Sequence, residues 1–332
     1  MFYNIAVVGF GLTGRLAALE LSKQHRVTVF EADNEHTQNS AGKVAAAIAP
    51  LAESVLCEAD LALMGLDSIK RWPGIIDELD SEVFFQQQGT LVVAHQQDKG
   101  DLQSFAQRLK PLANYTGESV NSQQIEMLEP ELANRFSQGL FLPCDGQIDN
   151  QAFYQASFTQ LNKRKVKFVF NQRVTINDNK INNREFDYII DCRGLGAKDD
   201  KPLRGVRGEV ARLYAPEVSL TRPVRLMHPR YPIYIAPKPN NEYVIGATEI
   251  ESQDTGPATV RSALELLSAA YTVHSGFAEA RLLNIQTGLR PAFSDNRPQV
   301  THVGRVISIN GLYRHGYMLA PSLVANALLC IE

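Results

Sequence analysis

Apolar and polar positions at the start of the chain predict a strand, a helix and a second strand. The continuous apolar run 5–8 is typical of a parallel strand buried on both faces, and it leads into the glycine-rich segment 9–14. Apolar residues then recur at helical spacing over 16–21, and a second β-branched run, 27–30, ends at Glu31. This order predicts a complete βαβ unit within about 30 residues.

Helical and extended patterns alternate through the middle of the chain. The predicted elements are a helix at 55–71, extended segments over 83–93, helices at 101–110 and 121–136, a helix after Asp149, and strands at 166–170 and 186–190. In the first of these helices, Leu56, Leu63, Leu66 and Ile69 stand near helical spacing. Asp149 is a predicted N-cap, because its carboxylate can accept the first free N–H groups of a helix.

The pattern becomes mainly β between residues 206 and 250, where Pro, Asn and Gly separate short apolar runs. A helix at 257–273, a strand at 306–309 and a final helix from about Ser322 follow. We therefore predict an α/β protein with a Rossmann-type domain interrupted by an inserted, mainly antiparallel β-sheet domain of α+β type. The Rossmann-type domain is assigned to 1–80, 145–205 and 285–332, and the inserted substrate-binding domain to 81–144 and 206–284.

Composition excludes several classes of protein. The 332 residues are 44% hydrophobic and 21% charged, which is ordinary for a globular protein. The net charge of −3 gives no electrostatic reason to expect nucleic acid or an anionic membrane as partner. The four cysteines lie far apart, so we expect reduced thiols and no metal site. Without a run of 18 apolar residues or a signal peptide, a cytoplasmic protein is expected.

The first glycine-rich turn carries a candidate dinucleotide site. In Gly9-x-Gly11-x-x-Gly14 the first glycine permits a tight turn, the second lets a pyrophosphate approach, and the third lets the helix pack on the strand. Glu31, at the end of the next strand, would accept the hydroxyls of an adenosine ribose. The alternative is a glycine-rich turn with a chance acid. The fingerprint does not choose between FAD and NAD.

A second glycine-bearing turn stands near the C-terminus, after the strand at 306–309. The run 310–321 leads from that strand into the last helix, and Gly288-Leu289-Arg290-Pro291 precedes it. The N-terminus of such a helix can stabilise negative charge on the pyrimidine edge of a reduced flavin. The alternative is a helix that only closes the sheet.

Taken together, these segments resemble the FAD-dependent D-amino acid oxidase (DAO) family, and within it the glycine oxidases of the thiamine-pathway type. The resemblance rests on motifs spread over the chain in family order. They are the 9–14 turn with Glu31, the small-residue run 44–50, Arg207-Gly208-Glu209-Val210, Tyr234-Ile235-Ala236-Pro237, 244–248, 288–291 and 313–321.

The resemblance implies a set of residues that hold FAD non-covalently. They are Gly9, Gly11, Leu12, Thr13, Gly14, Glu31, Ala32, Ser40, Ala41, Ala46, Ala47, Ile48, Val174, Gly194, Tyr313, Arg314, His315, Gly316, Tyr317 and Met318. Cys330, near the end of the last helix, is expected to be a buried or frayed thiol and not a covalent flavin link.

The substrate residues implied by the resemblance are Arg290 and Tyr234, with Arg314 as a further candidate. A guanidinium makes a planar bidentate pair with a carboxylate, and Arg290 is predicted in a turn framed by Gly and Pro. The alternative to substrate binding is a surface ion pair for Arg290 and core packing for Tyr234. Arg314 would contact flavin or cap a strand. His315 is expected to make structural hydrogen bonds and not to act as a base.

The resemblance implies an oxidase that turns a small amino acid, such as glycine, sarcosine or a small D-amino acid, into a 2-oxo acid. Dioxygen would be the second substrate, and ammonia or an amine and hydrogen peroxide the other products, with a role in thiamine thiazole synthesis. Two alternatives stay open: a flavin-dependent dehydrogenase of another amino or imino acid, and a non-catalytic flavoprotein. A homo-oligomer is compatible with the sequence.

Overall fold

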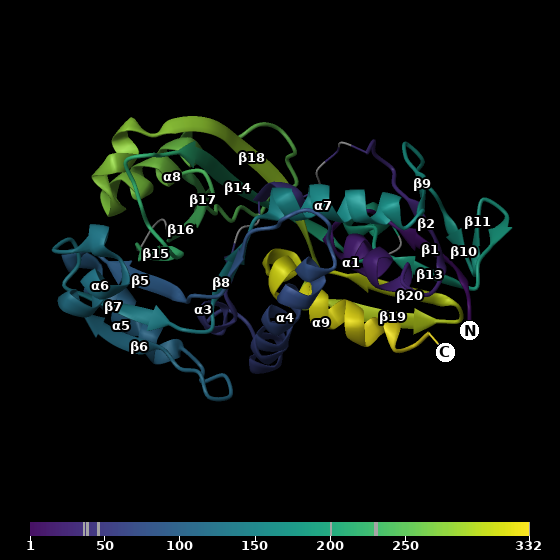
Figure 1. Ribbon diagram of the computed structural model, residues 1–332, viewed down its shortest axis with the longest axis horizontal. Helices are drawn as coiled ribbons and strands as arrows, with labels where there is room; N and C mark the ends of the chain where they lie inside the picture. Colours follow the sequence, from purple (N-terminus) through teal and green to yellow (C-terminus); the bar gives the residue numbers. More distant parts are fainter. Residues whose placement is uncertain (36, 38–39, 45–46, 200, 229–231, 332) are drawn as a thin grey trace.

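The computed structural model describes residues 1–35, 37, 40–44, 47–199, 201–228 and 232–331. Two large β-sheets dominate it, a six-stranded one at the right of Figure 1 and an eight-stranded one at the left. The chain passes between them several times, since the first sheet takes strands from both ends of the sequence and from its middle. The predicted α/β class and the inserted, mainly antiparallel sheet are confirmed.

The six-stranded sheet contains the predicted βαβ unit. Its strands, in spatial order, are β19 (Gln299–Val303), β20 (Val306–Asn310), β13 (Tyr188–Asp191), β1 (Asn4–Val8), β2 (Arg26–Phe30) and β9 (Lys167–Val169). All neighbours are parallel except β19 and β20. Ile5 and Val7 pack into the core on one face, whereas Ala6 and Val8 pack on the other. Burial on both faces explains why this strand is a continuous apolar run.

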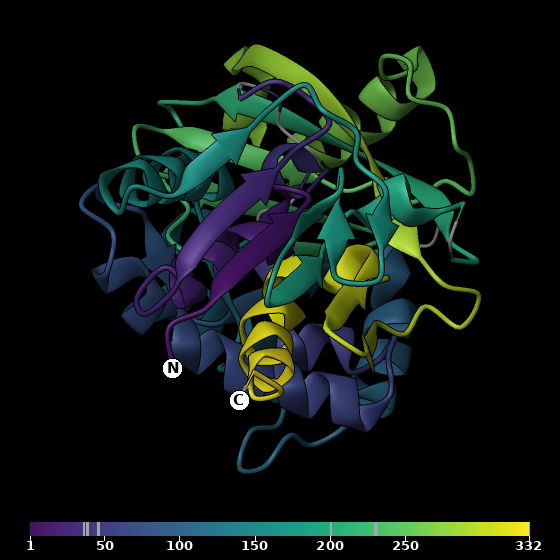
Figure 2. The same ribbon diagram turned by 90° about the vertical axis from the view of Figure 1, so that its right-hand side faces the viewer.

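Helices cover one face of this sheet and a small sheet covers the other. The helices are α1 (Leu12–Leu21), α7 (Asn150–Lys163) and α9 (Gly316–Leu328), and α4 (Ala59–Asp77) packs on the outside of α9 in the same core. The small sheet consists of β10 (Ile176–Asn177), β11 (Lys180–Ile181) and β12 (Arg184–Glu185). In Figure 2 the purple strands β1 and β2 face the viewer, with the yellow helix α9 below them in the view.

The eight-stranded sheet is antiparallel apart from one pair. Its strands, in spatial order, are β18 (Arg281–Ala292), β14 (Arg204–Tyr214), β17 (Glu242–Gly246), β16 (Ile233–Lys238), β15 (Val224–Met227), β5 (Thr90–Ala94), β7 (Gln138–Leu142) and β6 (Glu118–Asn121). The parallel pair is β5 with β15. Helix α8 (Val260–Val273) covers the outer face, and α5 (Lys99–Arg108) and α6 (Ser122–Leu128) pack around β5, β6 and β7.

Short elements connect the two large sheets. They are the helices α2 (Ser40–Val44) and α3 (Pro50–Glu53) and the three-stranded sheet of β3 (Ala47–Ile48), β8 (Gly146–Ile148) and β4 (Phe85–Gln86). The predicted boundary at residue 285 falls inside β18, which lies wholly in the eight-stranded sheet. The domain boundaries otherwise stay predictions.

Two helices predicted from the sequence were wrong in extent. The helix predicted at 121–136 is α6 followed by a 3₁₀ turn at Pro130–Leu132, because proline cannot continue an α-helix. The helix predicted at 55–71 starts at Ala59, after Leu56. Leu63 is 47% exposed and points away from the core. The predicted cap is confirmed, because the Asp149 carboxylate accepts the first free N–H groups of α7.

Candidate active site

A cavity of about 530 Å³ lies between the two large sheets. Four strands of the six-stranded sheet, β1, β2, β13 and β20, contribute their carboxyl ends or the residues just after them to its wall. Ligands of open α/β sheets bind at this edge, where the strand order reverses. The inner face of the eight-stranded sheet forms the opposite wall, so the cavity joins the two units of the fold.

Most residues predicted to hold a flavin line this cavity. They are Gly9, Gly11, Leu12, Thr13, Glu31, Ala32, Ser40, Ala41, Ala47, Val174, Gly194, Tyr313, Arg314, His315, Gly316, Tyr317 and Met318. Gly14 and Ile48 do not line the cavity, and Ile48 is buried in the hydrophobic core. Ala46 lies outside the described residues.

Glycine is required at two positions of the first turn because other backbone atoms come too close to leave room for a side chain. Gly9 has a φ of +95°, and a Cβ there would stand 2.5 Å from the carbonyl oxygen of Cys192. A Cβ on Gly14 would stand 1.9 Å from the Gly9 carbonyl oxygen, so this residue brings α1 against β1. No side chain caps α1 at Gly11 among the described residues. Its first N–H groups are therefore available to an anion such as a pyrophosphate.

Glu31 is held in place at the far end of this turn. One oxygen of its carboxylate, Oε2, accepts a hydrogen bond of 2.6 Å from the backbone N–H of Phe10, and the other accepts one of 3.2 Å from the N–H of Asp33. A carboxylate offers about four acceptor positions, so two bonds leave room for ribose hydroxyls. Glu31 therefore also ties the turn to the end of β2.

The other end of the cavity is built by side chains on the inner face of the eight-stranded sheet. Arg225, Tyr234, Gly246 and Val210 lie directly opposite one another on the adjacent strands β15, β16, β17 and β14. Residues paired in this way project from the same face of a sheet. Arg225 and Tyr234 both line the cavity, so the phenol and the guanidinium stand side by side there.

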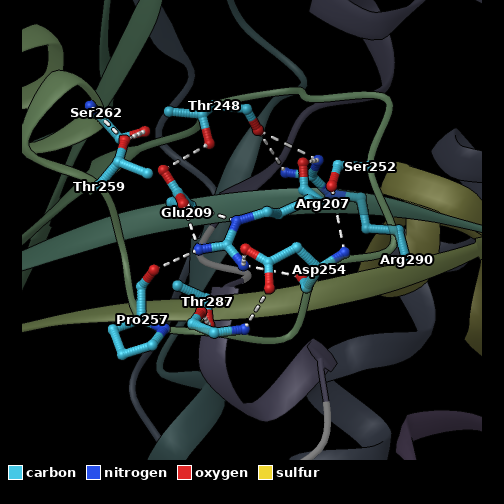
Figure 3. A network of polar contacts seen from close by, with 11 residues as sticks. Arg207, Glu209, Thr248, Ser252, Asp254, Pro257, Thr259, Ser262, Thr287 and Arg290 are labelled. Carbon is cyan, nitrogen blue, oxygen red and sulfur yellow. Dashed lines mark hydrogen bonds and ion pairs between the residues drawn. The ribbon is translucent and has the colours of Figure 1, made fainter.

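Arg290 lies in strand β18, opposite Val206, and not in the turn predicted from its glycine and proline neighbours. Its side chain is buried at 8% exposure and donates two hydrogen bonds of 3.2 Å to the Thr248 carbonyl oxygen (Figure 3). No carboxylate of the described residues forms an ion pair with it. Burial lowers the pKa of Arg290, and the nearby Arg314 lowers it further. Both effects disfavour the charged form of the guanidinium, so a carboxylate bound beside Arg290 would stabilise that charge.

Arg314 differs from Arg290 because two carboxylates already neutralise it. Its Nε lies 3.0 Å from Glu53 Oε2, and its Nη1 contacts Glu249. Glu53 also pairs with Arg225, 3.2 Å away. Burial would raise the pKa of Glu53, but Arg314 and Arg225 lower it to about 2, so this carboxylate stays charged. Glu53 and Arg225 were not predicted from the sequence, since their pairing joins distant segments.

His315 is buried beside this cluster. Its Nδ1 lies 3.5 Å from Glu53 Oε2. Burial lowers the pKa of His315 to about 4, although the charge of Glu53 opposes this shift. The imidazole is therefore neutral near pH 7. A structural role for His315 stays a prediction, and this geometry supports it.

A family model described as FAD dependent oxidoreductase (DAO) matches residues 4–326. The chain belongs to this family. It is 37% identical over 325 residues to the putative thiamine biosynthesis oxidoreductase ThiO of Rhizobium etli, covering 97% of this chain and 94% of that one. Glycine oxidase of Geobacillus kaustophilus is 25% identical, over 96% and 90% of the chains. The solved glycine oxidase of Bacillus cereus superposes with a TM-score of 0.83 at 19% identity, over 98% and 96%.

Membership of the DAO family decides for FAD where the glycine fingerprint left NAD open. The residues present fit this cofactor: α1 offers an uncapped N-terminus, Glu31 is fixed beside it, and the lining continues from Val174 to Tyr234 and Arg290. The protein is thus an FAD-dependent oxidoreductase with a Rossmann-type FAD-binding unit. Among the described residues, no helix combines the length and apolarity needed to cross a membrane.

Proposed function

We propose that this protein is an FAD-dependent oxidase of a small amino acid, with glycine, sarcosine and small D-amino acids as the candidate substrates. The products are a 2-oxo acid, ammonia or an amine, and hydrogen peroxide. One observation carries the proposal: Arg290 is a buried guanidinium at the cavity wall with backbone carbonyls as partners and no carboxylate of the described residues. A substrate carboxylate would complete it.

The other side chains of this end assist binding and orientation. Tyr234 lines the cavity, and burial raises the pKa of its phenol, which therefore stays protonated and can donate to the same carboxylate. Bound FAD supplies the two-electron acceptor for the substrate. The neutral His315 and the permanently charged Glu53 are poorly suited as bases near pH 7. Orientation of the substrate and exclusion of water therefore account for catalysis.

The charges at this end favour a substrate with a single carboxylate. Three guanidinium groups, Arg225, Arg290 and Arg314, face two carboxylates, Glu53 and Glu249, so three minus two leaves one positive charge. One substrate carboxylate neutralises it. A second acidic group would bring an uncompensated negative charge into a partly buried site, which is costly.

The names of the relatives support the finer parts of the proposal. A putative thiamine biosynthesis oxidoreductase and a glycine oxidase are both similar over nearly the whole chain. Glycine is therefore the first substrate to test. We infer that the product serves thiamine thiazole synthesis. Dioxygen as acceptor, a cytoplasmic location and a homo-oligomeric state belong to the same proposal.

Anaerobic bleaching of the flavin tests the substrate directly. The FAD-loaded protein is mixed with glycine, sarcosine, D-alanine, L-proline or D-aspartate, and absorbance near the flavin maximum is followed. We expect bleaching by at least one small monocarboxylic amino acid and little by D-aspartate. Admission of air should restore the colour and release hydrogen peroxide. Reoxidation only by an artificial acceptor would favour a dehydrogenase, and no bleaching by any amino acid would contradict the proposal.

A further inference from the structure

Two glycines lie beneath the two side chains that we assign to the substrate carboxylate. Gly208, in β14, and Gly246, at the end of β17, both face the cavity side of the eight-stranded sheet. Neither has a positive φ, so their backbones would accept other residues. The reason for glycine must therefore lie in what packs against them.

At Gly208 the neighbour is the guanidinium of Arg290. A Cβ on Gly208 would stand 2.3 Å from Nη2, 2.4 Å from Cζ and 2.7 Å from Nη1 of that side chain. All three distances are shorter than carbon contacts allow, so the planar group lies flat on the backbone of β14. At Gly246, a Cβ would stand 2.8 Å from the Tyr234 hydroxyl oxygen, 2.9 Å from its Cζ and 2.8 Å from Cγ1 of Val210.

We propose that Gly208 is a positioning residue for carboxylate recognition, and that Gly246 has the same role toward Tyr234. The absent side chain at Gly208 lets the Arg290 guanidinium lie on the sheet with its remaining donors directed at the cavity. Arg290 is the flexible partner in this contact, so a Cβ at Gly208 displaces the guanidinium and leaves the strand intact. This inference rests on the proposed function, because it assumes that Arg290 binds the substrate carboxylate.

The carbonyl oxygen of Thr248, which accepts hydrogen bonds from both Nη1 and Nη2 of Arg290, cannot follow such a displacement. The backbone of Thr248 is bound to β14 by its N–H, which donates to the Glu209 carbonyl oxygen at 3.1 Å. On the outer face, the buried Arg207 donates to Glu209 and to the carbonyl oxygens of Asp254 and Pro257 (Figure 3). This network holds the segment after β17 against the sheet. A moved guanidinium therefore loses its hydrogen bonds to Thr248.

The test is Gly208→Ala in the FAD-loaded protein, with Gly205→Ala as matched control. Gly205 lies in the same strand, and a Cβ there would meet only side-chain atoms of leucines, no nearer than 3.3 Å. Acetate is the carboxylate probe, titrated against the flavin absorbance at constant ionic strength. Gly208→Ala should weaken acetate binding and kcat/KM by about tenfold to a hundredfold, the usual cost of a misplaced binding group. Flavin content and Tm should match those of Gly205→Ala, which should bind acetate normally.

A double-mutant cycle separates positioning from a general effect on the sheet. In an Arg290→Lys background the planar group is gone, so Gly208→Ala should change acetate affinity less than about twofold. Equal losses in both backgrounds, normal acetate binding by Gly208→Ala, or a Gly208→Ala protein without FAD would each overturn the inference. Wild-type protein that does not bind acetate would also overturn it. Acetate results as expected, with no amino acid bleaching the flavin, would refute the proposed substrates alone.

Discussion

At the scale of single residues, three arginines reach one end of the cavity and differ in what already neutralises them. Arg225 and Arg314 share the carboxylate of Glu53, and Arg314 also contacts Glu249. Arg290 has backbone carbonyls as its partners. A guanidinium that is already paired gains less from a new anion than one that is buried without a counter-ion. This difference distinguishes Arg290 from Arg314, which the sequence analysis named only as a further candidate.

Replacement of Arg290 by alanine should damage substrate recognition and leave the flavin environment intact. Deletion of one partner of a buried ion pair costs on the order of 3–5 kcal/mol. We expect kcat/KM to fall by about a hundredfold or more, with a normal flavin spectrum. Arg290→Lys should recover only part of the loss, because an ammonium cannot form the planar bidentate pair.

Two controls accompany this prediction. Arg261→Ala removes an exposed arginine of α8 and should leave kcat/KM unchanged. His315→Ala should cost less than about tenfold if the imidazole is structural. Near-normal kcat/KM in Arg290→Ala for every oxidised amino acid would show that another group, with Arg314 the first candidate, holds the carboxylate.

Glu31→Ala should weaken FAD binding. The lost hydrogen bonds to a charged group are worth about 1.5–3 kcal/mol, or roughly a tenfold to hundredfold rise in the dissociation constant of FAD. The structure adds a second cause, because the variant also loses the bond from Phe10 that fixes the glycine turn. Isothermal titration of the apoprotein measures the effect, with the exposed Glu20→Ala as control. Unchanged FAD affinity in a folded Glu31→Ala protein would place the ribose contact elsewhere.

At the scale of elements, helix α9 shows where the sequence could not predict the structure. The sequence analysis predicted this helix from about Ser322, just after Pro321, a residue type that removes an N–H and disfavours a helix interior. In the structure α9 begins at Gly316. Pro321 leaves the Tyr317 carbonyl oxygen without its usual partner, and the indole Nε1 of Trp72 donates to it at 3.0 Å. A partner 245 positions away is invisible to local patterns, as was the pairing of Glu53 with Arg225.

Local sequence patterns were enough to predict those features of the structure that depend on residues close together in the chain. The glycine turn, the strand before it and the acid after it follow from spacing alone, and the cap at Asp149 follows from the type of its side chain. Arg290 lies at the cavity wall, and its predicted role as the carboxylate ligand stays a prediction. Its place in a strand could not be predicted, because β18 is stabilised by pairing with β14, a strand far away in the sequence.

Helix α3, which carries Glu53, is attached to β8 through a buried carboxyl group. Asp145 Oδ1 accepts a 2.9 Å hydrogen bond from the Leu51 N–H. Burial raises the pKa of Asp145 to about 7, although hydrogen bonds from the N–H groups of Leu51 and Ala52 oppose the shift. The unfolded chain therefore loses this proton at lower pH than the folded one. The resulting stabilisation is complete below about pH 4 and is lost as pH rises through 7.

Asp145→Asn should remove this pH dependence, since an amide keeps the acceptor oxygen and does not ionise. The free energy of unfolding of wild type relative to Asp145→Asn should fall between pH 5 and pH 8, by on the order of 1 kcal/mol per pH unit at most, and the Tm should fall with it. Thermal unfolding of both FAD-loaded proteins at the two pH values measures the difference. Parallel curves would mean that the pKa of Asp145 is not raised into this range, which would contradict the prediction.

At the scale of the whole molecule, the cavity draws its walls from both large sheets, so its ligand should hold them together. We expect the purified protein to be yellow and added FAD to raise the Tm of the apoprotein. A ligand at a hundred times its dissociation constant stabilises the folded state by about 2.7 kcal/mol. For a chain of this size that corresponds to a rise of several degrees. Differential scanning fluorimetry with FAD and NAD tests this, and a colourless protein that FAD does not stabilise would contradict it.

The interleaving of the two sheets also sets an order of events during protein synthesis. Every strand of the eight-stranded sheet has been made when β18 ends at Ala292. The six-stranded sheet still lacks β20, the strand between β13 and β19, and the FAD cavity lacks its wall at 312–318. A nascent chain that has reached residue 305 therefore exposes the apolar edge of β13 to the translation machinery and its chaperones. The complete FAD cavity can therefore form only after these last segments have been added.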